Sequence, residues 1–102
     1  MTKEVKMNTL PNIHPGEILE EEFLKGFGVS AYRLAKEINI PATRIFQIIK
    51  GRRITADTAL RFSRYFGTTP EFWLNLQTAY DLKKEKVRIQ KELQNMPTVH
   101  SV

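Results

Sequence analysis

Residues 30–51, SAYRLAKEINIPATRIFQIIKG, constrain the fold of this chain more than any other stretch. Apolar residues recur in it at helical spacing on both sides of a short break. The break holds Asn39, which tolerates a left-handed backbone, and Pro41, which cannot continue a helix. Two short helices across such a turn form a helix-turn-helix, whose second helix can enter a DNA major groove. The residues expected to face the core are Leu34, Ala35, Ile38, Ile45, Ile48 and Ile49.

The length and the amino-acid composition favour one small cytoplasmic domain. The chain has 102 residues, enough for a modest core, and no cysteine, which excludes disulfides and thiolate metal sites. The N-terminal segment MTKEVKMNTLPNI has no apolar run, so we expect no secretory signal. No stretch approaches the roughly 20 apolar residues of a membrane helix. We therefore expect no association with a membrane.

Charge is unevenly distributed along the chain. Residues 30–66 hold eight basic and two acidic side chains, whereas residues 15–24 hold four glutamates and no base. The basic part coincides with the helix-turn-helix, as expected of a surface that meets phosphates. The acidic part is either a solvated helix face or a patch that meets a basic partner.

Three further helices are predicted, at residues 15–25, 56–66 and from 70 onward. Prolines at first helical positions, capping threonines and terminal glycines mark their ends. The last helix begins apolar nearly all round and continues as a charged stem, so its first half should pack and its second half project. No segment has the period of a strand, and the prediction is an all-α, five-helix fold with an extended C-terminal helix. The expected divisions are a flexible arm at 1–13, the folded domain at 14–94 and a flexible tail at 95–102.

Catalysis and metal binding find little support in the sequence. Its two histidines, His14 and His100, stand apart from any metal-ligand spacing or catalytic triad order. His14 is expected to be a helix cap or linker residue. We expect no enzyme activity, no cofactor and no metal.

DNA recognition, in contrast, has a coherent set of residues. The first turns of a recognition helix reach the bases, and here Gln47 can pair with adenine while the methyl groups of Ala42 and Thr43 can meet thymine. Thr43 has a plainer alternative as a helix-start residue, and Gln47 as an ordinary exposed one. The expected base readers are Ala42, Thr43, Phe46 and Gln47. The expected phosphate contacts are Ser30, Tyr32, Arg44, Lys50, Arg52 and Arg53, and Arg61 and Arg64 are expected to face solvent or DNA.

Tight operator binding by such a domain calls for a dimer, because each recognition helix reads one half-site and half-sites lie about 34 Å apart. The last helix is the expected source of the interface. The residues expected there are Phe72, Trp73, Leu76 and Tyr80, with a place in the domain core as the alternative for Trp73.

Three segments carry a resemblance to a known family: HPGEILEEEFL (14–24), VSAYRLAKEINIPATRIFQIIKGRR (29–53) and ITADTALRFSRYFGTTPEFWLNLQTAYDL (54–82). Together they resemble the HigA antitoxins, also called virulence-associated protein I, of the Xre/Cro-type helix-turn-helix group. The likeness spans roughly residues 14–84. This chain departs from many relatives at Pro41, where Ser or Thr is usual, and at Phe46, where a small or polar residue is usual.

The resemblance implies a lambda-repressor-like domain that forms a homodimer and represses its own operon at a palindromic operator. It also implies neutralisation of a HigB-like toxin, an mRNA endonuclease with a RelE-like fold. A stand-alone transcriptional regulator without a toxin partner is the alternative. A protein-binding adaptor with no DNA role is a more distant one, and a toxin of this kind would need the β-sheet that the sequence lacks.

Overall fold

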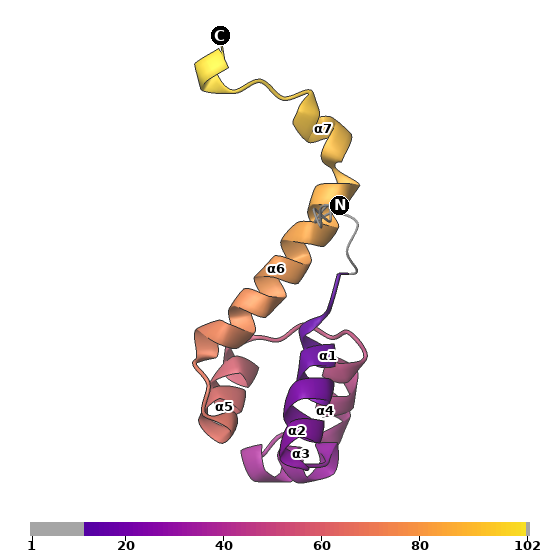
Figure 1. Ribbon diagram of the computed structural model, residues 1–102, viewed down its shortest axis with the longest axis vertical. Helices are drawn as coiled ribbons and strands as arrows, with labels where there is room; N and C mark the ends of the chain where they lie inside the picture. Colours follow the sequence, from indigo (N-terminus) through magenta and orange to yellow (C-terminus); the bar gives the residue numbers. More distant parts are fainter. Residues whose placement is uncertain (1–11, 102) are drawn as a thin grey trace, which may run out of the picture.

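A computed structural model describes residues 12–101 of the chain. Within these residues every regular element is a helix, which confirms the all-α prediction (Figure 1). Most of the arm expected at 1–13 lies outside the described residues. The elements are α1 (Pro15–Ile18), η2 (Leu19–Leu24), α2 (Lys25–Phe27), α3 (Ala31–Ile38), α4 (Ala42–Ile49), α5 (Ala56–Phe66), α6 (Pro70–Arg88), α7 (Gln90–Gln94) and η3 (Val99–Ser101).

The first three elements form one continuous rod, which corresponds to the first predicted helix. The backbone stays right-handed at both junctions, and its middle part, η2, is π-helical: the Lys25 N–H donates to the Glu20 carbonyl five residues back. The rod ends at Gly28, whose φ of 67° is left-handed. A terminal glycine was expected to end this helix, and the helix runs two residues further than predicted.

The caps read from the sequence lie where they were expected. The Thr55 hydroxyl accepts from the Thr58 N–H at 3.4 Å and begins α5, which Gly67 ends with a φ of 78°. The Thr69 hydroxyl accepts from the Phe72 N–H at 3.1 Å and begins α6. Each such side chain satisfies a backbone donor that the helix itself leaves free.

The core lies where α5 packs on α6, α3 on α4, and the rod on both α4 and α6. Trp73 is fully buried at its centre, with its ring centroid 5.0 Å from that of Phe62 and 4.9 Å from that of Phe23. Aromatic pairs at such separations stabilise a core beyond the area that they bury. The other buried apolar residues are Leu19, Leu24, Leu34, Ala35, Ile38, Ile45, Ile48, Ile54 and Ala59.

Gly16 explains how closely the rod approaches α4. A Cβ atom at this position would lie 2.0 Å from the backbone oxygen of Ile48, well inside contact distance. Only glycine therefore permits the first turn of the rod to rest on the end of α4.

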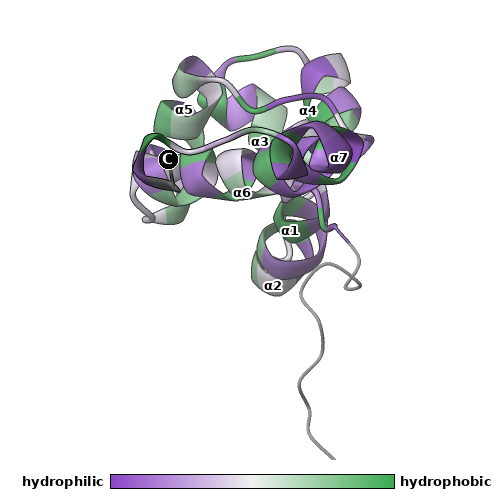
Figure 2. Cartoon of the chain, turned by 90° about the horizontal axis from the view of Figure 1, so that it is seen from above, coloured by the Kyte–Doolittle hydropathy of each residue, from purple (hydrophilic) through white to green (hydrophobic). Residues whose placement is uncertain are grey.

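The second half of α6 projects from the helical body (Figure 1). The radius of gyration is 17.2 Å, against about 13 Å for a compact domain of this length. Side chains from Lys84 to Arg88 are exposed, and the helical path is interrupted at Ile89 before the short α7, which is largely hydrophilic (Figure 2). This agrees with the prediction that the charged stem of the last helix projects.

Candidate nucleic-acid interface

The helix-turn-helix consists of α3 and α4. The Ser30 hydroxyl accepts from the Arg33 N–H at 3.0 Å and begins α3, and Asn39 ends it with a left-handed φ of 61°. The Ile40 N–H then donates to the Ala35 carbonyl, and the extended backbone of Pro41 leads into α4. The predicted break at Asn39 and Pro41 is confirmed.

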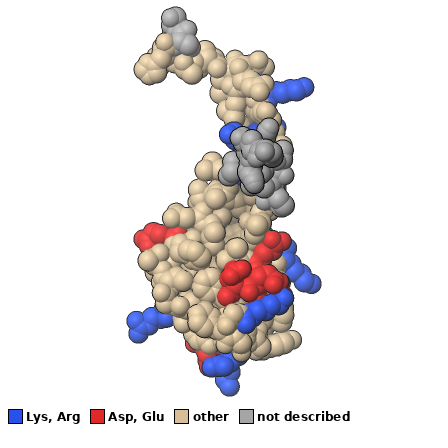
Figure 3. Space-filling view, in the orientation of Figure 1, with Lys and Arg blue, Asp and Glu red and all other residues tan. Residues whose placement is uncertain are grey.

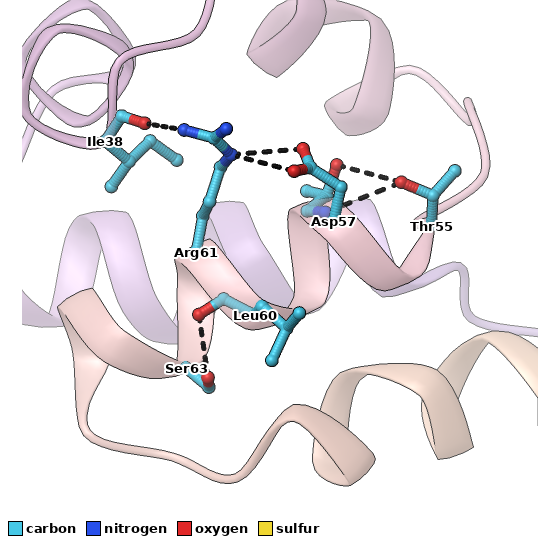
Figure 4. Close-up of polar contacts among 7 residues, drawn as sticks. Ile38, Thr55, Asp57, Leu60, Arg61 and Ser63 are labelled. Carbon is cyan, nitrogen blue, oxygen red and sulfur yellow. Dashed lines mark hydrogen bonds and ion pairs between the residues drawn. The ribbon is translucent and has the colours of Figure 1, made fainter.

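An arginine from α5 holds this turn in place. Arg61 donates from Nη1 to the Ile38 carbonyl at 2.7 Å and from Nε to the Asp57 carboxylate at 3.0 Å (Figure 4). Arg61 was expected to face solvent or DNA, and its side chain does keep 39% of its surface exposed, but its guanidinium is bonded to the protein. The physical reason is that the last carbonyls of α3 have no partner within their own helix, and the arginine supplies one.

The expected base readers differ in how much surface they offer. Thr43 and Gln47 are exposed on α4, whereas Ala42 is half-buried against the core. Phe46 is also half-buried, and its ring meets that of Tyr32 edge-on, with centroids 5.2 Å apart. Tyr32, from α3, keeps 69% of its surface exposed. The two helices thus present one aromatic pair between their polar residues.

Gln47 has a partner that sequence reasoning did not find. Arg52 folds back along the end of α4 and donates from Nη1 to the Gln47 Oε1. Their separation of five residues is no standard pairing along a helix, because the left-handed Gly51 reverses the chain between them. The spacing alone gave no signal of this contact.

The expected phosphate contacts come from both ends of the helix-turn-helix and have different partners. The Ser30 hydroxyl acts as a cap, and Arg53 donates to the Asp81 carboxylate of α6 at 2.7 Å. Lys50 and Arg52 are exposed after α4, and Arg44 is half-buried on it.

The Arg53–Asp81 pair belongs to a small network that joins the loop after α4 to α6. Buried Gln77 accepts from the Ile54 N–H at 2.8 Å through Oε1 and donates to Asp81 at 3.1 Å through Nε2. Desolvation raises the pKa of Asp81, but the hydrogen bonds from Arg53 and Gln77 outweigh it and hold the pKa below its usual value. The loop therefore has a fixed position relative to α6.

His14 lies beside this network as a buried helix cap, as expected. Its Nδ1 accepts from the Gly16 N–H at 2.8 Å, and its ring meets that of Tyr80 edge-on, with centroids 4.9 Å apart. Burial lowers the pKa of His14, and this effect exceeds the opposite effects of Glu17 and Asp81. An accepting Nδ1 requires the neutral ring.

The residues expected at a dimer interface are divided between surface and core. Trp73 is wholly buried, and its Nε1 donates to the Thr68 hydroxyl at 2.8 Å, so its side chain has no surface to offer a partner. This decides between the two roles left open by the sequence, in favour of the core. Phe72 is exposed, and Leu76 and Tyr80 are half-buried.

The described part of the chain has neither a cluster of metal ligands nor a membrane-spanning helix. Between residues 12 and 101 no three histidine, cysteine or carboxylate side chains gather as they would around a metal ion. In the same part of the chain no helix combines the length and apolar character of a membrane span.

The fold and these exposed residues define a helix-turn-helix domain, and a helix-turn-helix family profile matches residues 21–73. Virulence-associated protein I of Dichelobacter nodosus is 58% identical over 77 residues, covering 74% of this chain and 71% of that protein. The solved structure of Pseudomonas aeruginosa antitoxin HigA with the higBA promoter is 37% identical with a TM-score of 0.82, covering 87% and 99%. An addiction module antidote protein of the HigA family from Coxiella burnetii is 50% identical with a TM-score of 0.81, covering 89% and 100%. The chain belongs to this HigA family of helix-turn-helix proteins.

Proposed function

We propose that this chain is the antitoxin of a toxin–antitoxin pair that also represses its own operon. The observation that carries the proposal is its likeness to the HigA antitoxin solved with promoter DNA, of which it covers 99%. The proposed role is one of binding, in the cytoplasm, without catalysis or a cofactor.

DNA binding is assigned to α4 and to the groups around it. Thr43 and Gln47 are exposed for base contacts, whereas Ala42 packs against the core and Phe46 is half-buried beside Tyr32. Bases are read by such side chains, while contacts to phosphates fix the position of the protein. The proposed phosphate contacts remain Ser30, Tyr32, Arg44, Lys50, Arg52 and Arg53.

A homodimer is proposed to place two copies of α4 on a palindromic operator. Half-sites about 34 Å apart match two recognition helices related by a two-fold axis. The interface is assigned to the surface of α6 near Phe72, Leu76 and Tyr80. Trp73 supports it from within the core.

The proposed protein partner is a HigB-like toxin, and its binding site is assigned to the rod. Acidic side chains gather over the rod on the face drawn in Figure 3, and a basic RNA-cleaving protein would be attracted to them. Lys25 pairs with Glu21 at 3.0 Å, which leaves Glu22 and half-buried Glu20 as the less neutralised charges. Reversing Glu20, Glu21 and Glu22 to lysine should weaken toxin affinity, and an unchanged affinity would contradict this placement.

The proposal as a whole is tested by co-expressing the chain with the product of its adjacent open reading frame. We expect the two proteins to co-purify and the complex to bind the DNA upstream of the pair. Promoter binding without a protein partner would instead indicate a stand-alone transcriptional regulator. Equal affinity for promoter and unrelated duplexes would contradict the repressor role.

A further inference from the structure

The end of α4 carries a side-chain pair that changes what the recognition helix can read. Arg52 Nη1 donates to Gln47 Oε1, and the Arg52 N–H donates to the Gln47 carbonyl at 2.8 Å. Gln47 and Arg52 are thus linked by one main-chain and one side-chain hydrogen bond. Gly51, with a φ of 121°, makes the sharp reversal that brings them together.

This contact alters the hydrogen-bonding character of the glutamine. A glutamine amide has the acceptor Oε1, one of whose two lone pairs Arg52 occupies, and the donor group Nε2, whereas an arginine has donors only. With Oε1 directed at Arg52, the free Nε2 of Gln47 and the remaining N–H groups of Arg52 lie next to each other. Both side chains are exposed, so together they present a row of donors to a ligand.

This row of donors and an isolated glutamine suit different purines. Adenine offers the N7 acceptor and the N6 amino donor in the major groove, and guanine offers the N7 and O6 acceptors. An isolated Gln47 matches adenine, because Oε1 can accept from N6. Beside Arg52, the second contact comes from a donor, which fits guanine O6 and opposes adenine N6.

We propose that Gln47 and Arg52 act as one composite reader of guanine, with Arg52 as a base-reading residue instead of a phosphate contact. The inference rests on the proposed DNA-binding function and adds the base that it selects. It replaces the adenine expected for Gln47 from the sequence.

The experiment selects duplexes from a randomised library with the full-length chain, then measures affinities for duplexes that differ in one base pair. Gln47→Ala identifies the base pair concerned, as the one at which preference is lost. There we expect the unsubstituted protein to prefer guanine to adenine by about tenfold or more, in the range of a good bidentate pair. Arg52→Met frees Oε1 and should shift the preference toward adenine.

Lys50→Met is the matched control, because it removes one positive charge from an exposed side chain at the end of the same helix. It should weaken binding to all duplexes without changing the preferred base. Thermal unfolding midpoints that stay close to that of the unsubstituted protein would show that the variants fold, as expected for exposed side chains.

A guanine preference that Arg52→Met shifts toward adenine would support the composite reader. An adenine preference in the unsubstituted protein, or an Arg52→Met variant that loses affinity equally on all duplexes, would overturn it. If the unsubstituted protein enriched no sequence at all, the proposed DNA-binding function would itself fail, and the base assignment with it.

Discussion

Two residues in the segment HPGE give it a structural role at the level of single atoms. His14 caps the rod through Nδ1, and Gly16 lets the first turn of the rod touch the backbone of Ile48. The Gly16 contact places the rod against the end of the recognition helix, and the His14 cap begins the rod at this point. The segment therefore contributes to the DNA-binding surface without facing it.

Replacing Gly16 by alanine should lower the free energy of unfolding by about 1–3 kcal/mol, because the added Cβ meets a backbone oxygen that cannot move aside. Urea unfolding measures the change. Gly26→Ala is the control: nothing lies within 4 Å of its added Cβ, and the loss of backbone freedom in the unfolded chain should stabilise by about 0.5–1 kcal/mol. Equal effects of the two substitutions would contradict the close-contact account.

The pH dependence of stability should report on His14. Because burial lowers the pKa of folded His14 below 6.5, the unfolded chain binds this proton more readily. The stability contributed by neutral His14 is therefore complete above about pH 6.5 and is lost as the pH falls through the folded pKa. In His14→Asn, whose side chain can cap without titrating, stability should fall less steeply in this window. Urea unfolding at a series of pH values measures both proteins. If their free energies of unfolding changed with pH in parallel, His14 would not be the source of the pH dependence.

At the scale of elements, α5 contacts the turn of the helix-turn-helix through one arginine. Arg61 bridges Asp57 of its own helix and the Ile38 carbonyl of α3, so the position of the turn depends on a third helix (Figure 4). The recognition helix α4 starts directly after this turn, which spans the three residues 39–41. A substitution in α5 can thus change the position of the recognition helix.

Arg61→Met should lower the free energy of unfolding by about 1–2 kcal/mol, since a partly buried carbonyl loses a charged donor. Operator affinity should fall further than the loss of one charge explains. Arg64→Met, on the exposed side of the same helix, removes an equal charge and should leave stability nearly unchanged. Urea unfolding and anisotropy titrations of both variants make the comparison. Similar losses of stability and affinity for the two variants would contradict the proposal that Arg61 holds the turn in place.

At the scale of the whole molecule, α6 joins the helical body to a projecting stem. Gln77 and Asp81 fix the loop after α4 to its middle, and beyond Ile89 the side chains as far as residue 100 are exposed. The parts that build the core thus end well before the chain does.

Removing residues 90–102 should change the free energy of unfolding by less than about 0.5 kcal/mol, because the described side chains in this range are exposed. The shortened chain should also remain a dimer, since the proposed interface lies between Phe72 and Tyr80 of α6. Sedimentation equilibrium and urea unfolding test both statements. A monomeric product would place part of the interface in α7 or beyond it.

Much of the fold could be predicted because its signals are local. The caps Ser30, Thr55 and Thr69 bond to backbone groups three residues away, and the break at Asn39 follows from its own backbone preference. The candidate site was predicted less completely. Thr43, Gln47, Lys50 and Arg52 are exposed, but the partners that Arg52 and Arg53 find could not be predicted from their spacing.

The sequence by itself determined where the helices lie and most of their caps, because capping and helical periodicity act within a few residues of one chain segment. Only the tertiary structure decided that Trp73 lies in the core, that Arg61 holds the turn and that Arg53 pairs with Asp81 28 residues away. Such contacts depend on which elements meet and at what angle. The bond from Arg52 to Gln47 belongs with them, because it depends on the backbone reversal at Gly51.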